Sequence, residues 1–171
     1  MTDSADQPVT RSRPTDPPRS AWPGKRLRKT RGRRIGNAVV SALIDWGLVP
    51  YSYVMTTRGR RTGQLHSLPV SLVETDCEKW LVAPYGPVPW VLNARAAGRV
   101  SLRRRGRVGM YAVREVSADE AGPVLRKYVR IAGATRTYFA ANVDSPVADF
   151  TAEAHQHPVF ALTLVGGPGA G

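Results

Sequence analysis

Residues 56–64 read Thr56-Thr57-Arg58-Gly59-Arg60-Arg61-Thr62-Gly63-Gln64 and lie between two short apolar runs, 51–55 and 68–73. Both runs are typical of β-strands, so the stretch is expected to be a strand-to-strand loop. Its glycines permit a tight turn, and its arginines offer forked donors to phosphate or carboxylate. It lacks the following helix and the glycine spacing of a Walker loop or a dinucleotide-binding fingerprint. Two interpretations stay open: a loop that binds an anionic cofactor tail, and a solvated basic turn.

The chain has 171 residues, 42% of them hydrophobic, and a formal net charge of +12. This length suits one domain plus a tail. The basic balance favours an anionic partner such as nucleic acid, acidic lipid headgroups or a phosphorylated ligand. The single cysteine excludes an intramolecular disulfide and a multi-cysteine metal site, and it fits a cytoplasmic setting. We expect no membrane-spanning segment and no signal peptide.

The charge is concentrated at the N-terminus. Residues 1–34 hold ten Lys or Arg and three Asp or Glu, and seven of the ten residues in 25–34 are basic. With many prolines and few apolar side chains, residues 1–34 are expected to be a disordered arm. An apolar helical stripe follows at 35–48, and a basic segment beside such a helix is also typical of a peripheral membrane anchor. A helix packed on the domain core is the favoured interpretation.

Strands are expected at 51–57, 66–74 and 79–84, a short helix at 88–97, and a hairpin at 100–112 that turns at Arg105-Gly106. Ser117 and Glu120 form a capping-box pattern for a helix that ends near Arg130. Another helix is expected at 138–153 and a strand at 157–164, before a flexible tail at 166–171. This order favours an α+β domain around a small barrel, covering residues 35–165.

Four pieces in order carry a family resemblance: Tyr51-x-Tyr-Val-Met-Thr-Thr-Arg-Gly-Arg-Arg-Thr-Gly-Gln64, Leu68-Pro69-Val70, Leu81-Val-Ala-Pro-Tyr-Gly86 and Pro89-Trp90-x-x-Asn93-x-x-Ala96-x-Gly98-x-Val100. Together they resemble the deazaflavin-dependent nitroreductase family of actinobacterial oxidoreductases. The resemblance covers about residues 35–165. It implies an FMN-binding split-barrel-like fold with flanking helices, the coenzyme F420, and hydride transfer to a quinone, enone or nitro compound.

The resemblance also implies a set of cofactor-binding positions. They are Gly59, Arg60, Arg61, Thr62 and Gly63 in the loop for the coenzyme's phosphate and polyglutamate tail, His66 and Pro69 in the next strand, Ala83, Pro84, Tyr85 and Gly86 against the deazaflavin ring, and Trp90 and Asn93 in the adjacent helix. Arg61 stands where many members have Lys, and His66 stands where an Arg is common. Neutral imidazole would bind phosphate more weakly than a guanidinium. Pro84-Tyr85 replaces a common Ser-Lys pair, which changes the substrate face of the pocket.

A hydride acceptor that gains negative charge needs a hydrogen-bond donor. Tyr85 and Tyr138 are the candidate catalytic residues, for proton donation or for substrate stacking, whereas Tyr128 is favoured as a core residue. Glu153, His155 and His157 superficially resemble part of a metal site, but a helix end before a strand is the favoured interpretation, and no metal is expected.

Three functional hypotheses stay open. The first is an F420-dependent reductase, with a small-molecule acceptor as partner. The second is a related split barrel that binds FMN or haem. The third is a module that binds an anionic surface through the basic arm; here a peripheral membrane contact through the arm and residues 35–48 is favoured over nucleic acid. The protein is expected to be cytoplasmic or membrane-associated, as a monomer or a homodimer.

Overall fold

The computed structural model describes residues 51–166. The elements in chain order are β1 (Ser52–Arg58), β2 (Leu65–Glu74), β3 (Lys79–Val82), α2 (Pro89–Ala97), β4 (Arg99–Arg104), β5 (Arg107–Glu115), α3 (Ala118–Ile131), the 3-10 helix η1 (Gly133–Tyr138), α4 (Val147–Glu153), the 3-10 helix η2 (Ala154–Gln156) and β6 (Val159–Gly166). The expected basic arm at 1–34, the helix at 35–48 and residues 167–171 of the expected tail lie outside the described residues.

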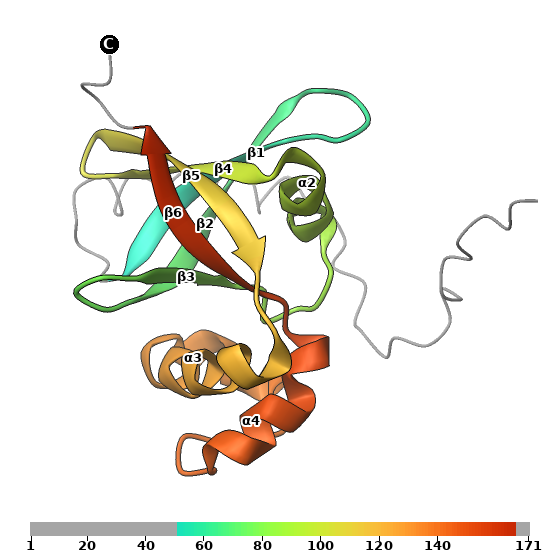
Figure 1. The fold of residues 1–171 in the computed structure, drawn as a ribbon, viewed down its shortest axis with the longest axis vertical. Helices are drawn as coiled ribbons and strands as arrows, with labels where there is room; N and C mark the ends of the chain where they lie inside the picture. Colours follow the sequence, from blue (N-terminus) through green and yellow to red (C-terminus); the bar gives the residue numbers. More distant parts are fainter. Residues whose placement is uncertain (1–50, 167–171) are drawn as a thin grey trace, which may run out of the picture. The chain divides into compact units, whose positions relative to one another are not determined.

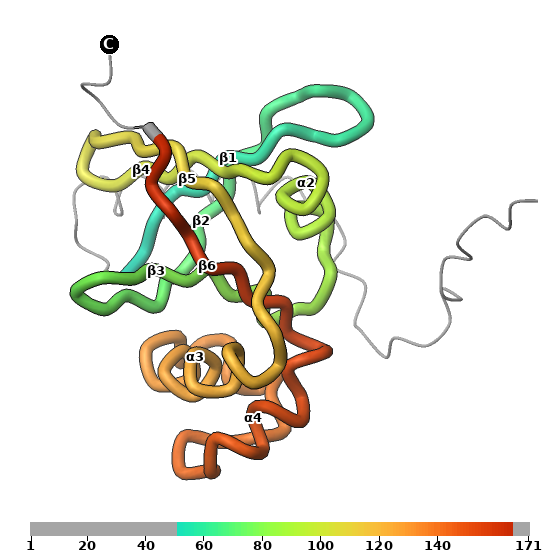
Figure 2. Tube along the Cα trace, in the orientation of Figure 1, coloured from blue at the N-terminus to red at the C-terminus, as the bar shows by residue number. Residues whose placement is uncertain are grey.

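The six strands close into a barrel in the order β1-β2-β3-β6-β5-β4, with every neighbouring pair antiparallel (Figure 1). The tube in Figure 2 follows β1 out into a long loop and back into β2, which pairs with it from Ser52↔Ser71 to Arg58↔Leu65. The structure confirms the predicted α+β class and the split barrel with flanking helices.

The barrel interior is apolar because alternate residues of each strand point inward. Its buried members are Met55, Leu72, Leu81, Ala83, Trp90, Val91, Ala94, Val100, Leu102 and Phe160. Three of these come from α2, whose Trp90 ring lies 6.0 Å from the ring of Phe160. The buried face of α2 therefore belongs to the barrel core, which holds this helix against the strands.

A second core joins the barrel to α3 and α4, which lie together below it in Figure 1. Val73 and Val82 of the strands meet Leu125 and Tyr128 of α3 and Phe150 of α4 there. Tyr128 is buried, as predicted for a core residue, and burial raises the pKa of its hydroxyl to about 12.

The predicted capping box at the start of α3 is present. The Ser117 hydroxyl accepts the backbone N–H of Glu120 at 3.3 Å, and the Glu120 carboxylate accepts the backbone N–H of Ser117 at 3.3 Å. Hydrogen bonds from Arg114, followed by the bond from Ser117, lower the pKa of Glu120 to about 2. The carboxylate therefore stays charged near the positive end of the helix dipole.

Gly122→Ala is expected to destabilise the protein, although alanine in place of a helical glycine is normally favourable by about 1 kcal/mol. A Cβ at Gly122 would lie 2.2 Å from Thr151 Oγ1, 3.2 Å from the Thr151 nitrogen and 3.2 Å from Val147 Cγ1. Overpacking at such a contact costs about 1–3 kcal/mol. Chemical denaturation of Gly122→Ala and of Gly122→Ala/Thr151→Ala measures the effect, and the double variant should recover part of the loss. A more stable single variant would contradict the close approach of α3 and α4.

The structure differs from the sequence expectations in the C-terminal third. The single helix expected at 138–153 is instead η1, a loop and the short α4. Pro146 lies inside the expected helix, and proline removes a backbone donor, so α4 begins only after it. β3 ends at Val82 and β6 begins at Val159, so both strands are shorter at that end than expected. β6 also runs through Gly166, which was expected to begin the tail.

Candidate functional site

The loop between β1 and β2 is a closed turn held by backbone hydrogen bonds. The Gly59 N–H donates to the Gln64 carbonyl at 2.7 Å, and the Gly63 N–H donates to the Gly59 carbonyl at 2.8 Å. Gly63 has φ +69°, a left-handed conformation that glycine adopts without steric cost. The turn therefore fixes the residues between its glycines, Arg60 to Thr62, at the tip of the hairpin.

His66 lies over this turn from the first residues of β2. Its Nε2 atom would be only 3.1 Å from a Cβ placed on Gly59. A side chain at position 59 would therefore displace the imidazole. The resemblance placed Gly59 in the binding loop and His66 in the strand after it, and the structure places the two side by side.

Asn93 of α2 holds the loop against the barrel. Its Oδ1 atom accepts the Arg60 backbone N–H at 3.2 Å and the Arg60 Nη1 at 3.3 Å. The Asn93 residue is only 6% exposed. Because a buried amide oxygen that loses its donors pays a desolvation penalty, this contact ties the loop conformation to α2.

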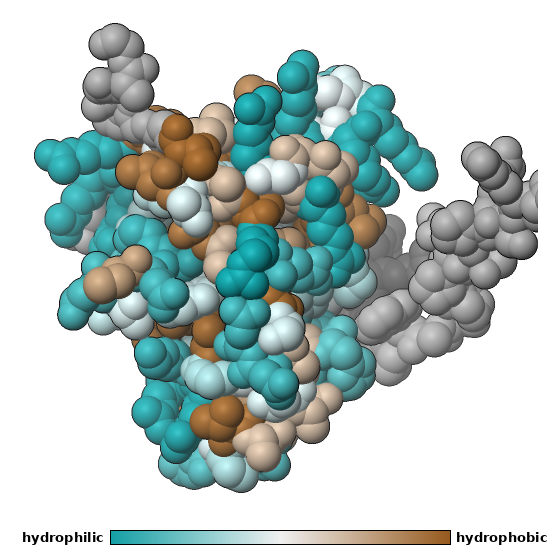
Figure 3. Space-filling model, in the orientation of Figure 1, coloured by the Kyte–Doolittle hydropathy of each residue, from teal (hydrophilic) through white to brown (hydrophobic). Residues whose placement is uncertain are grey.

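A hollow of about 350 Å³ lies where the loop meets the C-terminal half of α2. It is lined by Arg58, Gly59, Arg60, Gly63, Asn93, Ala96 and Ala97. None of these side chains is acidic, and hydrophilic side chains cover the loop at the upper right of Figure 3. The small alanines of α2 leave room, and the arginines supply positive charge, so the hollow suits an anionic group.

The segment from Ala83 to Gly86 lies between β3 and α2. The Ala83 N–H donates to the Pro158 carbonyl at 2.9 Å, and the Gly86 N–H donates to the Ala83 carbonyl at 3.2 Å. Ala83, Pro84 and Gly86 are buried, whereas Tyr85 is 45% exposed. The backbone of this segment is therefore fixed, and it presents one aromatic side chain at the surface.

Tyr85 meets Tyr138, the last residue of η1. The two ring centroids are 4.6 Å apart with an interplanar angle of 89°, an edge-to-face contact, and Tyr138 is 50% exposed. Such aromatic pairs prefer this geometry. The sequence singled out both tyrosines without any signal that they would touch, and the fold brings them together across 53 positions of the chain.

Comparison with known proteins identifies the family. The F420H(2)-dependent quinone reductase model matches residues 25–150, well over half of the chain. The chain belongs to the F420H(2)-dependent quinone reductase family. Coenzyme F420 is therefore its cofactor, its partner is a small-molecule acceptor, and the protein is an F420-dependent oxidoreductase. No curated protein matches the chain.

Two solved structures with TM-scores of 0.50 and 0.51 share the fold at low sequence identity. A protein described as a domain-swapped dimer has a TM-score of 0.50 at 20% identity, covering 77% of this chain and 96% of its own. Atu2129 from Agrobacterium tumefaciens str. C58, of unknown function, has a TM-score of 0.51 at 12% identity, covering 68% and 49%. An F420-H2 dependent reductase, FDR-A, has a TM-score of 0.47 at 20% identity, covering 67% and 95%.

The side chains that line the hollow suit the anionic part of the family's cofactor. F420 carries a phosphate and a glutamate tail, as the resemblance implied, and the hollow offers arginine side chains with no competing carboxylate. Arg61 and Thr62 are exposed at the loop tip, and no hydrogen bond or ion pair ties Arg61 to another residue in 51–166. Its guanidinium is therefore available to a ligand that lies along the loop.

Two further positions implied by the resemblance lie outside the hollow. Pro69 lies in β2 opposite Val54, on the face away from the barrel core that receives Leu68 and Val70. β2 bonds to β3 only from Leu72 onward, so proline at 69 removes no hydrogen bond on that side. Trp90 is buried in the barrel core, where it anchors α2.

Sequence reasoning missed some residues at the site. Arg58, Ala96 and Ala97 line the hollow. The Arg58 side chain donates from Nε to the Gly63 carbonyl at 3.3 Å, so it also braces the turn. Arg58 was inside the stretch that the sequence singled out and Ala96 was in the quoted family motif, but neither was assigned to the site, and no pattern marked Ala97.

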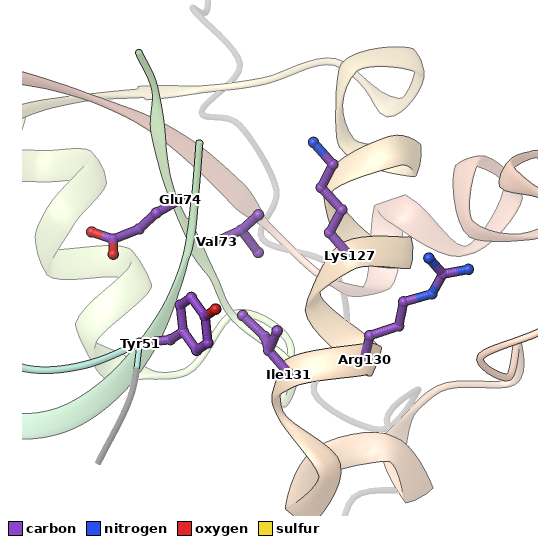
Figure 4. A pocket seen from close by; sticks show the side chains of 6 residues that line it. All are labelled: Tyr51, Val73, Glu74, Lys127, Arg130 and Ile131. Carbon is purple, nitrogen blue, oxygen red and sulfur yellow. The ribbon is translucent and has the colours of Figure 1, made fainter. Parts of the chain in front are cut away.

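A second hollow, of about 220 Å³, lies between the start of β1, the end of β2 and α3. Figure 4 shows its lining residues Tyr51, Val73, Glu74, Lys127, Arg130 and Ile131. None of the predicted site residues lines it. The carboxylate of Glu74 is already engaged, because it accepts the Tyr53 hydroxyl at 2.6 Å and pairs with Lys79. The site residues that the resemblance implied therefore lie away from this hollow.

The described part of the chain contains neither a cluster of metal ligands nor a membrane-spanning helix. Between residues 51 and 166, no three His, Cys, Asp or Glu side chains gather closely enough to hold a metal ion. None of the helices in that range has the length and apolar character required to cross a bilayer.

Proposed function

We propose that this F420-dependent oxidoreductase reduces a planar acceptor, namely a quinone, an enone or a nitro compound. The observation that carries the proposal is the edge-to-face pair of Tyr85 and Tyr138, exposed beside the buried segment that ends at Gly86. Exposed aromatic faces favour flat conjugated molecules over flexible aliphatic ones. The family description, quinone reductase, supports the same class of acceptor.

In this proposal, the 59–64 loop and the segment from Ala83 to Gly86 bind different parts of the cofactor. Arg60 and Arg61 bind the anionic tail, and Asn93 keeps Arg60 in place. The backbone from Ala83 to Gly86 lies against the ring system of the cofactor. When bound in its reduced form, F420 supplies the hydride, and the protein supplies position and electrostatics.

The two tyrosines act on the acceptor. A phenolic hydroxyl can donate a hydrogen bond to an acceptor oxygen that gains negative charge during reduction, and its ring can stack on a planar substrate. Either tyrosine satisfies the chemical requirement. Phenylalanine variants remove the donor and keep the ring, whereas alanine variants remove both.

The test is steady-state reduction of menadione, cyclohexenone and a nitroimidazole by wild type, Tyr85→Phe, Tyr138→Phe and Tyr85→Ala/Tyr138→Ala. We expect kcat/KM to fall by about tenfold or more in at least one phenylalanine variant, as loss of a hydrogen bond to a charged group predicts, and further in the double alanine variant. Affinity for F420 should change little, because the loop is untouched. Wild-type protein that binds F420 but reduces none of the three acceptors would refute the proposed acceptor class.

A further inference from the structure

His157 occupies a buried position between the two segments that carry the tyrosines. The residue follows η2, lies two positions before the start of β6, and is 3% exposed. Its Nδ1 atom lies 3.1 Å from the Pro84 carbonyl oxygen, across 73 positions of the chain. Pro84 directly precedes Tyr85 in the chain.

The direction of this hydrogen bond follows from chemistry. A carbonyl oxygen only accepts, so the His157 Nδ1 carries the proton and donates it to Pro84. The other ring nitrogen, Nε2, has no hydrogen-bond partner among residues 51–166 and lies 3.7 Å from Glu153 Oε2. Burial lowers the pKa of His157 against the opposing effect of Glu153, which favours the neutral ring with its single proton on Nδ1.

The neighbouring carboxylate of Glu153 accepts hydrogen bonds from two backbone N–H groups. Glu153 Oε2 accepts the Ala140 N–H at 2.9 Å, and Oε1 accepts the Ala141 N–H at 3.2 Å. These bonds hold the chain directly after Phe139. Glu153 therefore fixes the loop after η1 and does not depend on a proton from the imidazole.

The same imidazole ring also contacts the η1 side of the site. Its ring stacks on Phe139 with centroids 4.1 Å apart and planes inclined by 27°. Phe139 is the residue next to Tyr138. One buried ring thus holds Pro84 by a hydrogen bond and Phe139 by stacking, one position away from each tyrosine.

Among residues 51–166, His157 is the one side chain that donates a hydrogen bond to the Pro84 carbonyl. Ala83 is bonded through its N–H to the Pro158 carbonyl, and a Cβ on Gly86 would lie 3.4 Å from the Gln156 carbonyl oxygen. The segment thus rests on residues 156–158 at both ends, with the His157 hydrogen bond between them. Loss of that bond would free the peptide that leads into Tyr85.

We infer that His157 is a positioning residue, which sets the Tyr85–Tyr138 pair for acceptor binding through its hydrogen bond to the Pro84 carbonyl and its stacking on Phe139. This inference rests on the proposed function for the role of the two tyrosines. It assigns no contact between His157 and the substrate, because the side chain is buried behind both segments.

Three variants separate the hydrogen bond from the packing. His157→Asn places an amide N–H near the position of Nδ1 and can still donate to Pro84. His157→Gln carries its amide farther out, near the position of Nε2. His157→Phe keeps a ring against Phe139 without a donor. The Asn and Gln variants are both uncharged amides, so their comparison is decisive even when the Phe variant does not fold.

The experiment combines a readout on the cofactor-free protein with kinetics. Hydrogen exchange of the Gly86 amide, which donates to the Ala83 carbonyl, should quicken by about tenfold in His157→Gln and His157→Phe and stay near wild type in His157→Asn. In menadione reduction, KM should rise by about tenfold in the same two variants, with Asn within about twofold of wild type. The dissociation constant of F420 should change by less than KM for menadione does, because the loop that binds the anionic tail keeps its contacts with Asn93.

Each outcome separates the two claims. If all three variants match wild type in exchange and in KM, His157 does not position the pair and the inference fails. If Asn is impaired as much as Gln, the hydrogen bond to Pro84 is not the cause and the inference also fails. If wild-type protein shows no F420-dependent reduction, the proposed function fails, and the exchange data alone then decide whether His157 holds the Pro84 segment.

Discussion

Replacing both Arg60 and Arg61 with alanine is expected to weaken F420 binding by about 100-fold or more. Hydrogen bonds to charged groups contribute about 1.5–3 kcal/mol each, and every 1.4 kcal/mol is a tenfold change in affinity. Removal of the Arg60 side chain should weaken binding in two ways, because this side chain contacts the ligand and also donates a hydrogen bond to Asn93 that helps to hold the loop. Arg61 has no such tie within the described residues, so its removal should affect the ligand and leave the fold intact.

Fluorescence titration of oxidised F420 measures the effect at low salt and at about 150 mM salt. The matched control is Arg105→Ala/Arg107→Ala, which removes two charges from the β4–β5 turn. Because Thr56 pairs with Ser101 in antiparallel register, that turn lies at the barrel end away from the 59–64 loop. The control should keep wild-type affinity, since it lowers the net charge by the same amount at a distant site.

Two results would contradict this assignment. Unchanged affinity in the loop variant would show that the loop is only a solvated basic turn. An equal loss in both double variants would show that F420 senses the overall charge of the protein rather than a specific site. Single variants then rank the two arginines, with Arg60→Ala expected to cost more than Arg61→Ala.

The conformation of the 59–64 loop was predictable from the sequence because neighbouring residues decide it. Gly63 needs a left-handed backbone, and the strands on either side alternate in the usual way. The same holds for Ser117 and Glu120, whose capping box depends on four consecutive residues. Where a few neighbouring residues decide the geometry, the pattern and the structure agree.

The acceptor side of the site was not predictable, because it depends on residues far apart in the chain. The contact of Tyr85 with Tyr138 and that of His157 with Pro84 exist only once β3 and β6 pair, from Lys79↔Leu162 to Val82↔Val159. The helix expected at 138–153 is also replaced by η1, a loop and α4, and Tyr138 at the end of η1 is exposed. Periodicity carries no information on such pairings.

Phe150→Ala is expected to lower the free energy of unfolding by about 3–5 kcal/mol, the usual cost of deleting a large buried aromatic side chain. Phe150 is 0% exposed and belongs to the core between the barrel, α3 and α4. α4 is only seven residues long, so its own helix propensity cannot hold it in place. Packing of this ring is what keeps α4, and Glu153 at its end, against α3.

Urea denaturation followed by tryptophan fluorescence measures the loss, with Leu164→Ala as the control. Leu164 is 59% exposed in β6, so its truncation should change the free energy of unfolding by less than about 0.5 kcal/mol. Equal effects in both variants would contradict the role of Phe150 as a core residue beneath the barrel. The 59–64 loop rests on α2 and the barrel, so Phe150→Ala should retain F420 affinity at urea concentrations below its unfolding midpoint. Menadione reduction should fall, because the contacts of Glu153 with Ala140 and Ala141 loosen. Loss of F420 affinity together with stability would instead show that the helical layer supports the binding loop as well as the acceptor side.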